Sequence, residues 1–427
     1  MVNILLITSY HFPDNHVASW RWYRLITKLS NRHINFKVIS ADNNIEYPED
    51  RIKRVSGLYE KSYRKKYSRR VRKGPISDVK KIKQNSKLKT GILKVRRFGS
   101  LVVDFPDFSW RGYHPLLRAC EDLMSSENKI DLIIATHPYV INLRVARELS
   151  KRHNIPWIAD MRDGWSSNLF SPYLDFPILN KFIAFIETQL LKSAAAVVCV
   201  NEQLASTIKI SGNKRHVISN AFNDEVKHDN RISLAKSDGM INITIAGGIK
   251  EKHSFKVFLE ALSKHLPFVN SRIRINYYGR DYDRLSEYSR RIGLPDDIII
   301  NNGYQPLSKI ESALRSSDFL LIFGWTGELH ETYTSGKLFD YLQARKPIIA
   351  VASKESSLGS IVLTTKTGFV VETVDETSSL ISLILNDDLD FSWFHSDCSI
   401  VRTNQFSVEE TSNNYFNLIM KILNATV

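Results

Sequence analysis

The sequence contains few cysteines and no long apolar segment. Its three cysteines, Cys120, Cys199 and Cys398, lie far apart, and none belongs to a Cys-x-x-Cys pair. This spacing argues against a disulfide framework and a structural zinc site, and it fits a reducing compartment. No apolar run approaches the roughly 20 residues that a transmembrane helix needs. The amino terminus lacks the basic lead and cleavage site of a signal peptide, so we expect a cytoplasmic protein.

The first expected strand–helix unit also lacks a nucleotide signature. No Gly-x-Gly-x-x-Gly motif opens it, which excludes an ordinary NAD-binding fingerprint. The chain shows no internal repeat.

Positive charge is concentrated in one segment. Residues 51–97 contain 19 lysines and arginines but only Glu60 and Asp78 as acids, giving a net charge of +17. The whole chain carries +14, so the remainder is slightly acidic. The basic character therefore belongs to this segment and not to the folded part as a whole. Residues 45–98 also show little periodic apolar pattern, which is typical of a long insert.

The remaining sequence alternates between strand and helix patterns. At 427 residues the chain exceeds the size at which single cores usually divide, so we expect two domains. Short apolar runs indicate buried parallel strands at 3–8, 36–39, 132–135, 156–159, 194–200, 216–218, 241–246, 274–278, 297–300, 318–323, 347–351 and 368–371. This alternation predicts an α/β protein with two doubly wound, Rossmann-like domains facing across a cleft.

The expected domain boundaries follow from composition. We expect an N-terminal domain at 1–225 carrying the basic insert, a C-terminal domain at 238–403, and a terminal helix at 404–427 that packs back on the first domain. In the first domain, Ile178, Phe182, Phe185 and Ile186 recur at helical spacing and define one helix face. Capping-box spacing occurs at Ser308 with Glu311 and at Ser407 with Glu410.

The stretch Ser335–Ile349 combines an expected anion site with a hydroxyl acceptor. A small-residue turn that opens a helix after a parallel strand presents free N–H groups and the positive end of the helix dipole. Lys337 adds a full charge, and Asp340, one turn further on, offers an acceptor for sugar hydroxyls. This combination suits a nucleotide diphosphate. An ordinary strand–helix–strand unit, in which Gly336 only starts the helix, would show the same pattern.

Five motifs occur in the order found in GT-B glycosyltransferases. They are Tyr10–Asp14 with Ala18, Ser19 and Arg21 behind it, Pro156–Trp165, Val200–Ala205, Val217–Asn223 and Gly336–Leu342. They are similar to the patterns Y-F-P-P…G-x-S-x-R, P-W-x-x-D-x-R-D-x-W, V-S-E-x-L-A, V-I-P-N-G-F-D and x-K-L-x-E-Y-L-A-x-G-x-P. The chain therefore resembles the retaining, nucleotide-sugar-dependent glycosyltransferase family 4, including its bacterial surface-polysaccharide enzymes, over nearly all of its length except 45–98.

This resemblance implies the chemistry of the second domain. A nucleotide-diphospho sugar would transfer its sugar, with retention, to a glycan or lipid-linked saccharide. GT-B enzymes stabilise the leaving diphosphate with helix N-termini and basic side chains, so we expect no metal and no cofactor. The candidate donor-binding residues are Lys250, Lys252, Gly303, Tyr304, Glu328, Ser335, Gly336, Lys337 and Asp340.

The resemblance also implies separate roles for these residues. Lys337 and one of the lysines at 250 and 252 would bind phosphate, and Asp340 would bind the ribose. Gly303 and Tyr304 match the segment that contacts the base. Thr332 stands where the family has the first Glu of Glu-x7-Glu, and Glu328 is a candidate replacement near the donor sugar.

Candidate catalytic residues lie in the first domain. His137 follows one expected strand, and Arg162 and Asp163 follow the next, where open parallel sheets bind ligands. We expect His137 to position or polarise the acceptor hydroxyl. A structural histidine and an Arg162–Asp163 ion pair are the alternatives.

A loop of the same domain would face the diphosphate and the acceptor. Its candidate residues are Asp14, His16, Ser19 and Arg21. Asn15, His16 and Val17 replace the family's paired glycines, so this loop departs from the family pattern.

The basic insert suggests a surface-bound protein. Clustered Lys and Arg near anionic lipid head groups contribute about 1 kcal/mol each. We therefore expect peripheral binding of 51–97 to an anionic membrane at its inner face. The interleaved Tyr59, Tyr63 and Tyr67 leave nucleic-acid binding as a less favoured alternative. A catalytically silent GT-B protein is a third possibility because of the departures at Thr332 and His16.

Overall fold

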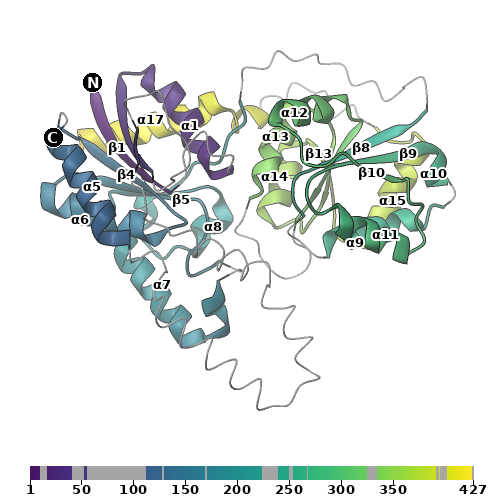
Figure 1. Ribbon diagram of the computed structural model, residues 1–427, viewed down its shortest axis with the longest axis horizontal. Helices are drawn as coiled ribbons and strands as arrows, with labels where there is room; N and C mark the ends of the chain where they lie inside the picture. Colours follow the sequence, from purple (N-terminus) through teal and green to yellow (C-terminus); the bar gives the residue numbers. More distant parts are fainter. Residues whose placement is uncertain are drawn as a thin grey trace. The chain divides into compact units, whose positions relative to one another are not determined.

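The protein consists of two units, each built on one parallel sheet (Figure 1). The computed structural model describes residues 1–9, 17–40, 52–54, 112–126, 129–168, 171–223, 239–249, 253–266, 268–324, 334–390, 394 and 402–425. Unit 1 comprises Met1–Ser219 and Ser412–Val427, and unit 2 comprises Asn220–Thr411. The chain therefore enters unit 2 after Ser219 and returns to unit 1 after Thr411.

Unit 1 contains a seven-stranded sheet in the order β3-β2-β1-β4-β5-β6-β7. Its strands are β1 (Val2–Thr8), β2 (Ile34–Ser40), β3 (Ile52–Arg54), β4 (Leu132–Thr136), β5 (Trp157–Met161), β6 (Ala196–Cys199) and β7 (Arg215–Val217). Every pairing is parallel. Both faces of this sheet are buried: Leu5 and Ile7 belong to one core and Ile4 and Leu6 to the other. This explains the unbroken apolar run of β1.

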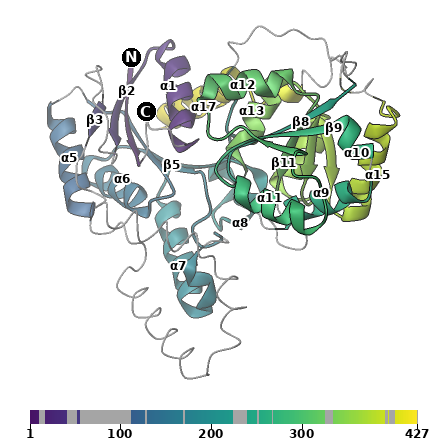
Figure 2. The same cartoon turned by 45° about the vertical axis from the view of Figure 1, so that its right-hand side comes forward.

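Helices cover both faces of the unit 1 sheet. They are α1 (Val17–Ser30), α5 (Tyr113–Ser126), α6 (Val140–His153), α7 (Pro177–Lys192), α8 (Glu202–Thr207) and α17 (Val408–Asn424), with short 3₁₀ helices at Pro172–Asp175 and Gly212–Lys214. Residues of α5, α6, α7 and α8 share one core with the sheet, and those of α1 and α17 share the other. Figures 1 and 2 show α17 beside α1, although almost 400 positions separate them in the sequence. The final helix therefore completes the first unit.

Most of the apolar face that helical spacing predicts in α7 is exposed. Ile183, Leu190 and Leu191 are buried, whereas Ile178, Phe182 and Phe185 are 84%, 54% and 56% exposed. Helical periodicity identified an apolar face but not the one that packs on the sheet, because α7 carries apolar residues around most of its circumference. The predicted helix is confirmed, and among the four residues of the predicted face Ile186 packs against the core.

Unit 2 contains a six-stranded parallel sheet in the order β10-β9-β8-β11-β12-β13. Its strands are β8 (Ile241–Ala246), β9 (Ile273–Tyr278), β10 (Ile299–Asn301), β11 (Phe319–Phe323), β12 (Ile348–Val351) and β13 (Gly368–Val371). This is the order of doubly wound nucleotide-binding folds. All the strands expected from the sequence in both units are confirmed within a few residues.

Helices also cover both faces of the unit 2 sheet. They are α9 (Ser254–Ser263), α10 (Phe268–Arg272), α11 (Tyr282–Arg291), α12 (Leu307–Ser316), α13 (Gly336–Ala344), α14 (Ser357–Thr365) and α15 (Val374–Leu385). One core includes α9, α10, α11 and α15, and the other includes α12, α13 and α14. In Figure 2, α12 and α13 lie above the sheet and α9 and α11 below it.

The first and last segments of unit 2 are joined by backbone hydrogen bonds. Phe222 N donates to Phe406 O at 2.9 Å, and Val408 N donates to Phe222 O at 3.0 Å. Ser407 Oγ accepts from Glu410 N at 3.1 Å and so caps α17 as expected. The corresponding expectation at Ser308 is wrong, because Pro306 is the N-cap of α12.

Most of the basic insert, including nearly all of 51–97, lies outside the described residues. None of the helices in the described part of the chain is long and apolar enough to cross a membrane.

Candidate functional site

The strand order of unit 2 reverses at β8. From this strand the chain continues to β9 and β10 on one side and then to β11, β12 and β13 on the other. The loops after β8 and β11 therefore lead to helices on opposite faces, α9 and α13. Open α/β sheets bind their ligands at the carboxyl ends of the strands at such a switch point.

Gly247, Gly248 and Lys337 meet at this point. Lys337, on the first turn of α13, donates a hydrogen bond from Nζ to the carbonyl oxygen of Gly248. Gly247 has φ of +82°, and a Cβ added to it would lie 2.6 Å from Lys337 Cε. The left-handed backbone therefore favours glycine here, and an added Cβ would also make the flexible end of the Lys337 side chain shift. The result is a fixed positive charge beside a bare backbone loop, an arrangement that suits phosphate oxygens.

Buried side chains hold this loop in place. Tyr341 OH accepts from Ala246 N at 2.9 Å and donates to Leu321 O at 3.2 Å, which links the ends of β8 and β11 to α13. Burial raises the pKa of Tyr341, so its hydroxyl remains protonated. Asp281 Oδ2 accepts from Ile249 N at 2.8 Å. The conformation of the Gly247 loop therefore depends on groups from three different strand–helix units.

The other expected donor residues of α13 stand at its amino end. Ser335 is the N-cap, but its side chain makes no capping hydrogen bond, and Gly336 is the first helical residue. Asp340 is half-buried and follows Lys337 by three positions, so the two side chains share a helix face. The structure thus brings Ser335, Gly336, Lys337 and Asp340 together with the Gly247 loop.

Gly303 and Tyr304 lie at the same edge of the sheet, two strands away. They follow β10, and Gly303 has φ of +65°. Tyr304 is 63% exposed, and the Arg280 guanidinium after β9 lies 4.5 Å from the centre of its ring. This pair forms a flat, positively charged platform that suits stacking of a nucleotide base.

Unit 1 has its own switch point between β1 and β4. Thr136 Oγ1 donates to Thr8 Oγ1 at 3.1 Å, and Asn142 Nδ2 donates to Ser9 Oγ at 2.8 Å. Asn142 Nδ2 also donates to Thr136 O at 2.9 Å. The carboxyl ends of the two strands are therefore joined by a buried polar cluster. Within the described residues, the buried Asn142 Oδ1 has no hydrogen-bond partner.

His137 follows directly after β4 and is 2% exposed. Its Nδ1 lies 2.9 Å from the carbonyl oxygen of Asp163, which accepts only, so Nδ1 carries the proton and Nε2 is an acceptor. Burial lowers the pKa of His137 to about 4; Asp163 opposes this shift and Arg162 adds to it. Among the described residues, Nε2 has no partner. The imidazole is therefore neutral, next to Arg162 and Asp163, and its Nε2 is a buried acceptor.

Known proteins resemble this chain in structure but not in sequence. No protein-family model matches the sequence. No curated protein matches it either. Sucrose-phosphate synthase from Thermosynechococcus elongatus superposes with a TM-score of 0.66 and 14% identity over 100% of both chains. Alr3699/HepE from Anabaena in complex with UDP and glucose superposes with a TM-score of 0.60 and 13% identity, over 99% of this chain and 100% of that one.

The chain has the fold of the GT-B glycosyltransferases. A putative UDP-N-acetylglucosamine 2-epimerase from Listeria monocytogenes is also similar, with a TM-score of 0.56, 11% identity and coverage of 100% of this chain and 98% of that one. Such a fold therefore occurs with more than one chemistry on nucleotide sugars, and the reaction has to be argued from side chains.

Two residues expected in the acceptor-side loop of this GT-B chain lie elsewhere. Ser19 and Arg21 are buried within α1. Arg21 Nη2 forms an ion pair with Asp160 Oδ1 at 3.0 Å, and Nη1 donates to Ser219 O at 2.6 Å. Burial acts to lower the pKa of Arg21, but the adjacent carboxylate raises it above its ordinary value. The loop assignment of Ser19 and Arg21 is therefore wrong, and Arg21 holds the core together.

The network around Arg21 extends to the terminal helix. Asp160 Oδ1 accepts from Tyr415 OH at 2.6 Å, and Asp160 Oδ2 accepts from Trp22 Nε1 at 2.9 Å. Asp160 is fully buried. Sequence reasoning did not identify this network. A carboxylate within the apolar strand Trp157–Met161 was the available signal, because a buried charge requires a partner.

Five candidate residues lie outside the described part of the chain: Asp14, His16, Lys250, Lys252 and Glu328. Their positions in the site stay predictions.

Two Asp-x-Asp pairs in the described residues are possible metal ligands by their spacing. Asp281–Asp283 and Asp388–Asp390 have the Asp-x-Asp spacing used by metal-dependent glycosyltransferases. The described residues nevertheless contain no group of three His, Cys, Asp or Glu side chains placed to hold a metal ion. Asp281 instead accepts the backbone N–H of Ile249.

Proposed function

We propose that the protein is a retaining, metal-independent glycosyltransferase that uses a nucleotide-diphospho sugar. The observation that carries this proposal is Lys337 held against Gly247 and Gly248 at the switch point of the unit 2 sheet. Support also comes from the GT-B fold and from the UDP bound in a structural neighbour.

Lys337 and the amino end of α13 stabilise the diphosphate leaving group in this proposal. Negative charge develops on the diphosphate as the glycosidic bond breaks, and preorganised donors lower the energy of that state most effectively. The amides of Ser335 and Gly336 act at the positive end of the helix dipole. Asp340 accepts hydrogen bonds from the ribose, and Gly303 and Tyr304 bind the base.

His137 positions or polarises the acceptor hydroxyl in this proposal. Because its Nδ1 proton is held by the Asp163 carbonyl, Nε2 accepts a hydrogen bond from a hydroxyl group. Its lowered pKa keeps this nitrogen unprotonated at neutral pH. Arg162 and Asp163 position the imidazole. The acceptor in this proposal is a growing glycan or a lipid-linked saccharide.

Nucleotide binding tests the site directly. UDP-, GDP-, ADP- and TDP-sugars are titrated into the full chain by calorimetry, with EDTA and then with Mg²⁺ or Mn²⁺. We expect one nucleotide sugar to bind with the same affinity in EDTA as with Mg²⁺ or Mn²⁺. Lys337→Ala and Asp340→Ala should weaken its binding at least tenfold. Lys366→Ala is the matched control, because this lysine precedes β13 at the opposite edge of the sheet.

Three outcomes contradict parts of the proposal. Binding that requires the added cation refutes metal independence, and equal losses in Lys337→Ala and Lys366→Ala refute the site. Absence of binding by every nucleotide favours a catalytically silent GT-B protein. Where slow donor hydrolysis occurs, early-time NMR of the released sugar shows whether the anomeric configuration is retained.

The basic segment 51–97 supports a proposed membrane partner. Its net charge of +17 favours binding to an anionic lipid surface at the inner face of the membrane. Cosedimentation with anionic but not neutral vesicles, weakened by salt, is the expected result. Preferential binding to an oligonucleotide of equal charge would favour the nucleic-acid alternative.

A further inference from the structure

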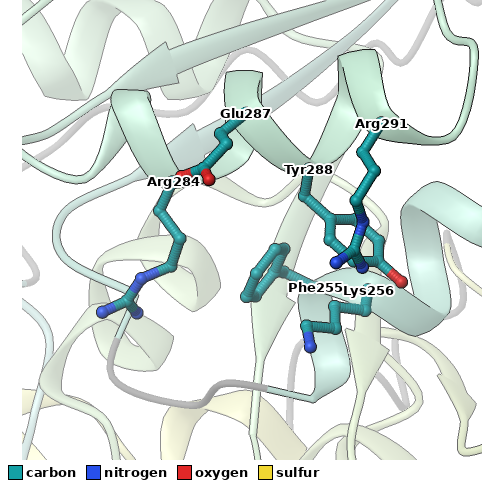
Figure 3. Close-up of a pocket in the computed structure, with 6 residues that line it drawn as sticks. All are labelled: Phe255, Lys256, Arg284, Glu287, Tyr288 and Arg291. Atoms are coloured by element: carbon teal, nitrogen blue, oxygen red, sulfur yellow. The ribbon is translucent and has the colours of Figure 1, made fainter.

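A second group of basic side chains lies on unit 2 between α9 and α11. The pocket has a volume of about 210 Å³ and is lined by Phe255, Lys256, Arg284, Glu287, Tyr288 and Arg291. Figure 3 shows the ring of Phe255 in the middle, with Arg284 on one side and Arg291 with Tyr288 on the other. None of these residues belongs to the donor site proposed above.

The pocket holds more positive charge than its surroundings neutralise. Lys256, Arg284 and Arg291 face one lining carboxylate, Glu287, and a second carboxylate, Glu260, binds the Tyr288 hydroxyl at the pocket. In the part of the chain that the structure describes, none of these three cations forms an ion pair. The neighbouring Arg290, in contrast, is paired with Asp296 at 3.2 Å. Positive charge gathered in a concave site attracts anions.

Two of the cations are held over one aromatic ring. Lys256 Nζ lies 5.1 Å and Arg291 Cζ 4.4 Å from the centre of the Tyr288 ring. The Tyr288 hydroxyl donates to Glu260 Oε1, which fixes the ring. The ring therefore orders two like charges that repel each other, and an anion between them would remove this repulsion.

We propose that this pocket binds a small phosphate-bearing anion. Arginine guanidinium groups match the oxygen geometry of phosphate, and lysine adds a point charge. The aromatic walls of Phe255 and Tyr288 accommodate the carbon part of a phosphomonoester. The volume of about 210 Å³ lies below the usual range of 300–1,000 Å³ for drug-sized ligands, so a small anion fits better than a nucleotide sugar.

The pocket is connected to the proposed donor loop. Arg284 Nη1 donates to the carbonyl oxygen of Ile249 at 2.8 Å, two residues after Gly247. The carbonyl of the intervening residue, Gly248, accepts from Lys337. An anion that attracts the Arg284 guanidinium competes with the Ile249 carbonyl and shifts this loop. Occupation of the pocket therefore changes nucleotide affinity, and by linkage the nucleotide changes anion affinity by the same factor.

Calorimetric titration of the full chain with inorganic phosphate, at constant ionic strength in chloride, tests the site. We expect Lys256→Gln and Arg291→Gln to weaken phosphate binding at least tenfold. Arg290→Gln is the matched control, because it removes the adjacent charge from outside the pocket, and it leaves binding unchanged. Glycerol phosphate in place of inorganic phosphate distinguishes an ester ligand from the free ion.

Lys337→Ala separates this proposal from the proposed function. Phosphate binding persists in Lys337→Ala if the pocket is the site, whether or not nucleotides bind. Phosphate binding that is lost in Lys337→Ala and kept in Arg291→Gln overturns the proposal, as does an equal loss in Arg290→Gln. The link between the pocket and the donor loop is tested with saturating phosphate, which should shift nucleotide affinity in the wild type. Arg284→Gln should remove that shift. An unchanged shift in this variant refutes the link through Arg284.

Discussion

Replacing Asp160 by asparagine is the sharpest test of how unit 1 is held together. The carboxylate accepts four hydrogen bonds: from Arg21 Nε at 3.3 Å, Arg21 Nη2 at 3.0 Å, Trp22 Nε1 at 2.9 Å and Tyr415 OH at 2.6 Å. Asparagine has nearly the same shape but no charge. It also points an N–H₂ group at two donors, whichever way the amide turns.

The expected loss follows from the burial of the pair. The side chains of Arg21 and Asp160 are 2% and 0% exposed, so solvent cannot compensate for the lost charge. Breaking a buried ion pair and leaving one partner charged costs about 3–5 kcal/mol. For a domain of roughly 150–250 residues, each kcal/mol lowers Tm by about 2–4 °C. Asp160→Asn should therefore lower the Tm of unit 1 by roughly 6–20 °C.

Tryptophan fluorescence is a suitable assay because five of the seven tryptophans lie in the sequence of unit 1. Thermal unfolding is followed by fluorescence for unit 1 and by circular dichroism for the whole chain. Glu148→Gln is the control, since it makes the same change in an exposed pair of the same unit, with Arg152 Nε at 2.7 Å. Exposed pairs contribute little, so no shift is expected there.

A Tm of Asp160→Asn within 2 °C of the wild type would refute this reasoning. It would mean that water or a backbone shift stabilises the Arg21 guanidinium without its partner. Tyr415→Phe, which removes one donor and keeps the charges, should cost less, about 1–3 kcal/mol.

Two further predictions concern the proposed site. Because the pKa of His137 is lowered to about 4 from 6.5, the unfolded chain takes up the proton first as the pH falls, so stability decreases between about pH 6.5 and 4. Urea unfolding should show that this group lowers the free energy of unfolding by about 2 kcal/mol between pH 7 and pH 5. His137→Gln should remove this part of the pH dependence. A variant with the same pH dependence as the wild type would contradict the assignment. Gly247→Ala should cost about 1–2 kcal/mol and displace Lys337, with nucleotide binding weakened as in Lys337→Ala. Gly293→Ala is the control, because Gly293 has nearly the same φ, +80°, but nothing lies within 4 Å of the added Cβ. This variant should lose stability and keep its nucleotide binding. Equal nucleotide binding in both variants would show that the contact with Lys337 does not matter.

The sheets were predictable because their strands are buried on both faces. A strand such as Phe319–Phe323 is a continuous apolar run, and a general rule of such sheets predicts a ligand site beyond its carboxyl end. Ser335, Gly336, Lys337 and Asp340 could therefore be placed from the sequence. His137 could be placed for the same reason, since it directly follows a strand.

Contacts between distant segments were not predictable. Arg21, Asp160 and Tyr415 are joined across 139 and 255 positions, and no local pattern specifies such pairing. Tyr341 and Asp281 hold the Gly247 loop through the same kind of long-range contact. In α7 the periodicity was visible, but the packed face depends on which apolar residues meet the sheet, and Ile183 does so instead of Phe182.

The position of α17 has a consequence for biosynthesis. Unit 1 is interrupted by all of unit 2. Its sheet face around Ile4 and Leu6 is covered in part by α1, and α17 completes the cover only when residues 412–425 have been made. At about 5–20 residues per second, roughly 10–40 s separate the synthesis of Ser219 from that of α17. During this interval unit 2 emerges complete, whereas unit 1 exposes an apolar face and the Asp160 carboxylate lacks Tyr415. We therefore expect the first half of the nascent chain to expose part of its core until its last helix is made.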